Sequence, residues 1–518
     1  MTKKMIIILG ISLGIGKIAS AQSDVNDLVR YSGIQYQGTA RSTGAGNAFG
    51  AVGADFGGIG INPAGLGLYQ RSEFTGTLGF EETTTNGSYL GNSTTNASAP
   101  NFNVGNIGIV IANNKKQKGK DVSSGWFNVN WGIGFTRTNN FNSSMVIEGN
   151  NTNNSILANW KENANSFGVG PYGLADPNGA YYYTKGRLAF NTYMLDPAYY
   201  VNPTADSTKY VDATRFDNKI NVYQRDVIQT SGATNNISIS VAGNYLGKLY
   251  LGATINVPTV SFNSTRTFSE YNNNPRNGND SQYVSSRLSE SLTTTGVGIN
   301  ATIGAIYKFN DMFRLGLSVQ LPTVYSLTDI FGMSINGNTV ANGSLLDTAS
   351  NSTGFEYTIV TPARATLSGA VFFSQNGFLS VDYEYVDYAS ARVNGTSYVD
   401  LNQTVQNQLQ GVNTLRIGAE YRIQAFSLRA GYNYISSPYK SGLTNDGYGD
   451  TYNILSFGVG FRAKNMGLDL TYQLVTNNST YTPYILNDPA DIAQYGNSPS
   501  ANVTTTRGNL MLTFSTKF

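Results

Sequence analysis

The residues with the greatest chemical potential in this chain are arginines and carboxylates embedded in otherwise apolar stretches. They fall on the polar side of an alternating pattern, in a chain of which only 13% of the residues are charged. Such groups can pair across neighbouring strands, or an arginine can hold the acid group of a ligand. Both interpretations stay open for this set: Arg314, Arg364, Asp382, Glu384, Arg416, Glu420, Arg429, Arg462 and Asp469.

Histidine and cysteine are both absent from the 518 residues. Without histidine the chain has no His-ligated zinc or haem and no Ser-His-Asp triad. Without cysteine it has no disulfide and no lipid anchor attached through a thiol. The sequence therefore predicts a protein that is not an enzyme and that needs no cofactor. The formal net charge of +2 gives no indication of nucleic-acid binding.

The two ends of the chain indicate its destination. Residues 1–21 read as a signal peptide, with two lysines, an apolar run from Met5 to Ile18 and a small-residue site at Ala19–Ala21. That run is too short for a membrane-spanning helix. Residues 507–518 alternate apolar with polar side chains and end on an aromatic residue, Phe518, which is typical of a final outer-membrane strand. We predict a protein of the outer membrane of a Gram-negative bacterium.

Fourteen stretches have the length and alternation of membrane strands. In one of them Leu315, Leu317 and Val319 alternate with polar or small residues. We therefore predict an all-β protein, a transmembrane antiparallel β-barrel of about fourteen strands, in preference to a secreted β-sandwich or β-helix. The stretches are 72–82, 103–113, 127–138, 234–245, 248–262, 293–309, 312–327, 363–374, 377–389, 412–423, 426–437, 452–464, 467–476 and 507–518.

The connections between these stretches alternate between short and long. Because outer-membrane barrels have short periplasmic turns and long external loops, this rhythm predicts that both termini are periplasmic. Loops are expected at 83–102, 263–292 and 328–362, and the largest at 139–233, with a short helix near residues 155–167. The aromatic and apolar residues of that largest loop are interpreted either as a capture surface or as the packing of a lid: Trp160, Phe167, Tyr181, Tyr182, Tyr183, Phe190, Tyr193, Met194, Tyr199 and Tyr200.

The segment before the first strand, residues 22–71, has a different character from the barrel of residues 72–518. It is rich in glycine and other small residues, which let backbones approach closely. We therefore expect it to fold compactly inside the barrel. Residues 38–51, with Asp55 and then Asn62–Leu66, resemble the N-terminal hatch of the FadL-type family of outer-membrane transporters. Four later motifs resemble strands of the same family: Thr361–Arg364, Val381–Tyr388, Leu415–Arg422 and Leu428–Tyr432.

The resemblance implies a fourteen-stranded barrel plugged by its hatch. It implies passive transport of hydrophobic molecules such as long-chain fatty acids, with external capture, an internal apolar pocket, hatch-gated release and sideways exit. Its implied partners are such molecules, outer-membrane lipid and lipopolysaccharide, and the barrel-assembly machinery through the strand that ends in Phe518. The alternative function is that of a FadL-like carrier or accessory barrel in an outer-membrane protein secretion complex.

Three groups of site residues are predicted. By resemblance, Asn62, Pro63 and Ala64 form the gate in the hatch. Gly132 and Gly134 are a possible strand kink, because glycine within a strand often marks a bend. Possible contacts to a ligand's acid group inside the barrel are Arg364, Arg416 and Arg429.

Overall fold

The structure is a computed structural model that describes residues 25–113, 125–200, 202–216, 220–273, 283–441 and 451–518. The predicted signal peptide, residues 1–21, and most of the turn expected at 114–126 lie outside these ranges. Within them, no helix has the length and apolar character needed to cross a membrane.

Fourteen antiparallel strands form a closed barrel. It closes because β1 (Glu73–Tyr89) pairs with β2 (Asn92–Ile111) on one side and with β20 (Ala501–Lys517) on the other. The predicted fold class and strand number are confirmed. From β2 onward the wall consists of β3 (Trp126–Asn140), β7 (Val222–Tyr245), β8 (Leu249–Asn272), β9 (Tyr283–Lys308), β10 (Phe313–Gln320), β13 (Arg364–Phe372), β14 (Gly377–Asp387), β16 (Gly411–Ile423), β17 (Phe426–Ile435), β18 (Thr451–Arg462) and β19 (Met466–Tyr481).

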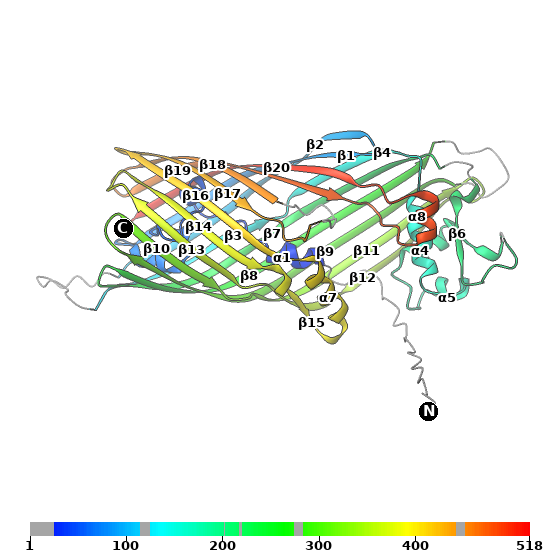
Figure 1. Cartoon of the computed structure of the whole chain (residues 1–518), viewed down its shortest axis with the longest axis horizontal. Coiled ribbons are helices and arrows are strands. Elements are labelled where there is room, and N and C mark those ends of the chain that lie inside the picture. The colour runs from blue at the N-terminus through cyan, green and yellow to red at the C-terminus, as the bar shows by residue number, and fades with distance from the viewer. Residues whose placement is uncertain (1–24, 114–124, 201, 217–219, 274–282, 442–450) are drawn as a thin grey trace, which may run out of the picture.

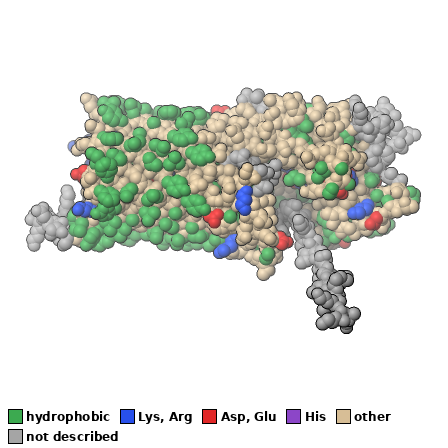
Figure 2. Space-filling view, viewed as in Figure 1, with side chains coloured by type: hydrophobic (Ala, Val, Ile, Leu, Met, Phe, Trp, Pro, Cys, Tyr) green, Lys and Arg blue, Asp and Glu red, His purple; other side chains and the backbone are tan. Residues whose placement is uncertain are grey.

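Alternation gives the barrel an apolar outside and a polar inside. Leu315, Leu317 and Phe457 are about half exposed on the outer surface, whereas Asp382 and Asp469 are buried on the inner one. Figure 2 shows the outward apolar side chains gathered in a band over one half of the visible face, at the end away from the helical cap. A band of this kind is the lipid-facing surface of a membrane barrel.

Several strands continue beyond this band after a break. β4 (Ser143–Asn151) continues β3 along β7, and β11 (Val324–Thr339) continues β10 along β9. β12 (Gly343–Val360) pairs with β11 and leads into β13. Pro322 and Pro362 lie in two of the breaks, where their missing N–H groups interrupt the ladder.

The outer ends of the strands are the main departure from the sequence prediction. The expected loops at 83–102, 263–292 and 328–362 are largely strand, so those loop predictions were wrong. The β1–β2 hairpin, for example, turns only at Leu90 and Gly91, both of which have positive φ. In the outer part of β1 one face stays buried, as at Thr83 and Thr85, but both faces carry mostly polar side chains. The apolar alternation that marks a lipid-facing strand in sequence is therefore missing there.

The segment predicted as one external loop, 139–233, contains β4, the first part of β7 and most of a helical cap (Figure 1, right). The predicted helix is confirmed as α4, which Ser155 caps by accepting a hydrogen bond from the Leu157 N–H. The cap consists of α4 (Ile156–Asn165), α5 (Pro171–Ala175), α6 (Lys185–Asn191), β5 (Leu195–Pro197), η2 (Ala198–Tyr200), β6 (Tyr210–Asp212), η3 (Ala213–Phe216) and α8 (Pro489–Tyr495).

Most of the aromatic residues of this segment pack the cap together. Trp160 is fully buried, and Phe167, Tyr181 and Phe190 pack against the same core. Lys161 lies 2.6 Å from Asp491 and 3.8 Å from Asp212. Burial lowers the pKa of Lys161, but these two carboxylates more than offset that effect and leave the pKa above its usual value. Of the two interpretations, packing as a lid is the one that these contacts support.

Residues 25–72, called the hatch below, fold inside the barrel as α1 (Val25–Ser32), α2 (Ala40–Gly44), α3 (Phe56–Ile59) and η1 (Pro63–Leu68) (Figure 1). The hatch meets the wall backbone to backbone. A Cβ atom on Gly431 would lie 2.1 Å from the Gly46 nitrogen, and one on Gly418 would lie 2.1 Å from the Ala45 oxygen. Glycine at these wall positions therefore lets the hatch seat against the strands.

Candidate functional site: hatch and lumenal cavity

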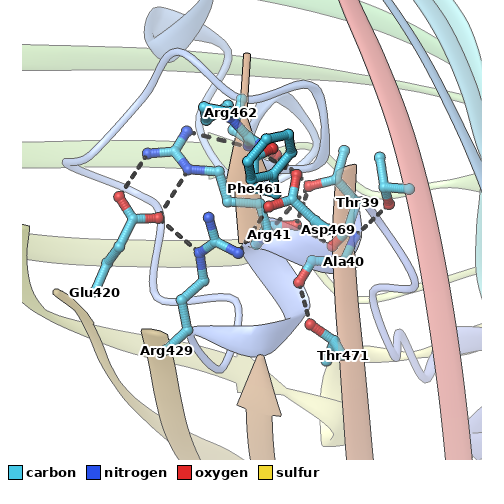
Figure 3. Close-up of polar contacts among 12 residues, drawn as sticks. Thr39, Ala40, Arg41, Glu420, Arg429, Phe461, Arg462, Asp469 and Thr471 are labelled. Carbon is cyan, nitrogen blue, oxygen red and sulfur yellow. Dashed lines mark hydrogen bonds and ion pairs between the residues drawn. The ribbon is translucent and has the colours of Figure 1, made fainter. Parts of the chain in front are cut away.

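A buried ion network fixes the hatch to the wall (Figure 3). Two arginines form ion pairs with one oxygen of Glu420, Oε2. The Nε of Arg41, on α2, lies 3.0 Å from it, and the Nε of Arg429 lies 2.7 Å from it. Arg429 Nη1 also lies 2.8 Å from Asp469 Oδ1. Arg429 is therefore committed to holding the wall and the hatch together, and its predicted contact with a ligand finds no support in its position.

Backbone groups of α2 add hydrogen bonds to this anchor. The Ala40 N–H donates to Thr513 Oγ1 at 2.7 Å, and Thr471 Oγ1 donates to the Ala40 carbonyl at 2.5 Å. On other strands, Asp382 accepts from the Gly50 N–H at 2.9 Å, and Ser318 donates to the Ile61 carbonyl at 2.7 Å. Because these partners come from strands all around the wall, the hatch spans the lumen.

The three residues predicted at the gate lie together where the hatch meets β9 and β10. The Asn62 side chain donates to the carbonyl oxygens of Gly50, Ala305 and Leu317 at 2.7, 3.1 and 3.5 Å. Its Oδ1 accepts from the Ala64 N–H at 3.1 Å, which caps η1. Pro63 occupies the first turn of that helix, where its missing N–H costs nothing.

The two glycines predicted as a kink lie in an unbroken part of β3. Gly132 pairs with Val110 and Gly134 with Gly108, and both also pair with β7. The ladder is therefore not interrupted at either residue. A different cause explains the glycines, at least at Gly134, where a Cβ atom would lie 2.3 Å from the Phe56 ring of the hatch.

The interruption lies a few residues further along β3. β2 pairs with β3 only between Asn106 and Ile111 in the described residues, although β2 itself continues outward on β1. Beyond Thr136, β3 has no pairing with β2, and a segment of the hatch lies along that edge of β3 instead. The Gln35 N–H donates to the Thr138 carbonyl at 2.7 Å and the Gln37 N–H to the Arg137 carbonyl at 3.2 Å. Residues 35–37 therefore close a seam in the wall.

A cavity of about 280 Å³ lies between the hatch and the wall, on the cap side of α2. Its volume is close to the lower end of the range for small-molecule pockets, about 300–1,000 Å³. Most of its wall is apolar, contributed by Val29, Ile34, Phe141, Met145, Ile228, Phe262, Val386, Tyr388, Val412, Ile435, Pro438, Tyr452, Val475 and Val503.

Two of the predicted arginines line this cavity and share one carboxylate. Arg364 Nη1 and Arg416 Nη2 each lie 3.1 Å from Glu384, on different oxygens. Arg364 also donates to the Ser32 carbonyl of the hatch. Arg416 Nη1 is buried and has no hydrogen-bond acceptor among the described residues. The cavity thus combines apolar walls with two arginines in its lining, Arg364 and Arg416.

Two further arginines at the cavity were not predicted. Arg507 Nη1 donates to Gln35 Oε1 at 2.8 Å, and the guanidinium of Arg30 lies 4.1 Å from the centre of the Phe262 ring. Arg507 falls on the inward side of the last predicted strand, so its alternation was a usable signal. Arg30 lies in the hatch, where the sequence has no periodicity that would indicate which way a side chain faces.

In the described part of the chain, no three carboxylates gather closely enough to hold a metal ion. No family model matches the chain, and no curated protein matches it either. Similar solved structures do exist. A FadL homologue from Pseudomonas aeruginosa is 12% identical, with 94% of this chain and 98% of that one covered and a TM-score of 0.53.

The toluene transporter TodX of P. putida is 14% identical, with 93% and 99% of the two chains covered and again a TM-score of 0.53. The chain has the FadL-type barrel fold. The fold implied by the sequence resemblance is therefore confirmed over nearly the whole length of both neighbours. At this level of identity the likeness describes architecture, so function rests on the site.

Proposed function

We propose that the protein is an outer-membrane channel for the passive transport of hydrophobic molecules, with long-chain fatty acids as the default ligand. The observation that supports this most is the lumenal cavity, because its walls are mostly apolar and its lining includes the guanidinium side chains of Arg364 and Arg416. An acyl chain would contact the apolar wall, and its carboxylate would accept from Arg416. The neighbours with this fold include a FadL homologue and a toluene transporter.

Release is proposed to depend on the hatch. Gln35, Asn139 and Asn140 line the cavity and also border the seam between β2 and β3. A shift of residues 35–37 away from Thr138 would uncover this seam and connect the cavity with the lipid. The proposed gate residue Asn62 does not border the seam. Its three hydrogen bonds hold a turn of the hatch against β9 and β10, so its role would be to keep the hatch in place.

Equilibrium binding tests this proposal. Delipidated protein should bind radiolabelled palmitate saturably, and Arg416→Gln should weaken that binding by about tenfold, the loss of one charge-assisted hydrogen bond. The methyl ester of the same acid should bind wild type and variant alike, because it has no carboxylate. Glu384 keeps Arg364 as a partner in the variant, so the fold should be retained.

Arg462→Gln is the matched control. Arg462 pairs with Asp469 at 2.7 Å, lies outside the cavity lining and is about one-third exposed. It should leave palmitate binding unchanged. Absence of saturable binding by the wild-type protein, together with co-purification of a secretion complex, would instead favour the accessory-barrel alternative.

A further inference from the structure

The segment that joins α1 to α2, residues 33–39, is called the link, and it lies in the seam between β2 and β3. Gln37 forms an antiparallel bridge with Arg137 of β3. On the other side, a Cβ atom on Gly105 of β2 would lie 3.2 Å from the Gln37 carbonyl oxygen. Gly105 directly precedes Asn106, where the pairing of β2 with β3 begins. Gln37 therefore lies between the two strands at the point where they separate.

One ion pair holds two side chains of the link from inside the barrel. Glu81 of β1 lies with its Oε1 3.3 Å from the Nε of Arg507 on β20. Gln37 Nε2 donates to Glu81 Oε2 at 3.0 Å, and Arg507 Nη1 donates to Gln35 Oε1 at 2.8 Å. Asn140, the last residue of β3, donates to Glu81 Oε1 at 2.6 Å. These residues, called the latch, join the link to β1, β3 and β20.

The latch is buried, so its hydrogen bonds count for more than they would in water. The side chains of Glu81 and Arg507 are 1% and 15% exposed. A hydrogen bond to a charged group contributes more than one between neutral groups, and it is stronger where water is excluded. The backbone of the link adds two bonds to β3, from the N–H groups of Gln35 and Gln37 at 2.7 and 3.2 Å. The latch therefore contributes a large share of the contact between the link and the wall.

The two helices that flank the link have anchors of their own. The Ser32 carbonyl at the end of α1 accepts from Arg364 of the wall, and Arg41 of α2 belongs to the ion network with Glu420. Loss of the latch would therefore free the link from the wall while α1 and α2 stay in place.

We infer that Glu81 and Arg507 set how often the seam opens, and thereby control the rate at which a ligand passes between the cavity and the lipid. This inference rests on the proposed function. Gln35, Asn140 and Arg507 line the cavity, whereas Glu81 and Gln37 do not. Glu81 and Gln37 are therefore positioning residues that act on the link and do not touch the ligand. A change at either should alter the exchange rates of the ligand and leave its affinity as it is.

The kinetics of ligand exchange test this role. Gln37→Leu removes the donor to Glu81 and keeps the backbone bond to β3. Exchange of dansyl-labelled undecanoic acid is followed by stopped-flow fluorescence with the protein in lipid nanodiscs. Loss of one hydrogen bond to a charged group should raise the association and dissociation rate constants about tenfold each. Their ratio, the dissociation constant, should change by less than about twofold.

Gln473→Leu is the matched control. Gln473 is also a buried glutamine of the lumen, but it lies outside the cavity lining and donates to Ser456 of the neighbouring strand at 3.4 Å. Both rate constants should stay as in the wild type. A heat-modifiability shift on gels checks that each variant is a folded barrel.

A second variant and a second readout separate the latch from the seating of the whole hatch. Glu81→Gln removes the ion pair with Arg507 and should raise both rate constants as well. The double variant should have less than the product of the two effects, because both changes weaken the same hydrogen bond. Maleimide labelling of a Ser42→Cys thiol, at a fully buried position of α2, should stay as slow in the Gln37→Leu background as without it.

Unchanged rate constants in both variants would overturn the inference. A change in affinity without a change in the association rate, or faster labelling at position 42, would do so as well. If wild-type protein fails to bind the probe saturably, the proposed function is wrong. If it binds and neither variant alters the exchange rates, only the role of the latch is wrong.

Discussion

Neutralising Glu420 should loosen the hatch without opening the barrel wall. Glu420 is buried and contacts three arginines: Arg41 at 3.0 Å, Arg429 at 2.7 Å and Arg422 at 2.6 Å. In a Glu420→Gln variant, Arg429 keeps Asp469 and Arg422 reaches solvent. Arg41, which belongs to the hatch, is left with Asp55 at 3.6 Å. The loss therefore falls mainly on the contact that ties the hatch to β16.

The size of the effect follows from that contact. A hydrogen bond to a charged group contributes about 1.5–3 kcal/mol, and Arg41 makes two with Glu420, one of them long at 3.4 Å. We expect seating of the hatch to weaken by about 2 kcal/mol. Since about 1.4 kcal/mol corresponds to a factor of ten, the fraction of molecules with an unseated hatch should rise about 30-fold.

A buried reporter cysteine measures this fraction. Ser42 of α2 is fully buried, so maleimide can react with a Ser42→Cys thiol only when the hatch is unseated. The labelling rate should rise about 30-fold in the Glu420→Gln background. Glu148→Gln is the control, because Glu148 pairs with Arg225 on the exposed surface and should change little. An unchanged rate in Glu420→Gln, or an equal rise in Glu148→Gln, would refute the anchoring role.

Three further outcomes are expected. Gly431→Val would place a side chain against the Gly46 backbone, and this overpacking should cost about 1–3 kcal/mol. Ion leakage through the protein in planar bilayers should therefore rise. Unchanged leakage would contradict the close seating of the hatch. Asn62→Ala removes the donor to three carbonyl groups and should raise the same leakage while the thermal unfolding midpoint of the barrel stays within a few degrees. Deleting Phe518 should reduce the amount of protein in outer-membrane fractions, and normal yields would remove this residue from the proposed assembly signal.

The membrane part of the fold was predictable because lipid on one side and a polar lumen on the other impose a two-residue period. Leu468, Leu470 and Tyr472 face outward as that period requires, and Asp469 and Thr471 are buried inside. A short helix near residues 155–167 was also predicted, and the structure shows Ser155 capping it. The outer half of β1 escaped prediction because residues 83–88 are mostly polar, so its two faces do not differ in sequence.

The site was only partly predictable, for a related reason. Alternation places Arg364, Arg416 and Arg429 on the inner wall, but it says nothing about what each meets there. Arg429 meets the hatch, and Arg416 meets the cavity. The contact that requires glycine at Gly134 could not be predicted, because its partner Phe56 lies far away in sequence and arrives there only when the hatch folds.

The most direct test of the account is to locate a ligand inside the barrel. Crystals grown with a fatty acid brominated at the end of its chain would give an anomalous signal at the bromine position. The account predicts a peak within the apolar lining of the cavity, with the carboxylate within hydrogen-bond distance of Arg416. A bromine peak confined to the cap or to the outer lipid-facing surface, with the lumen empty, would contradict it.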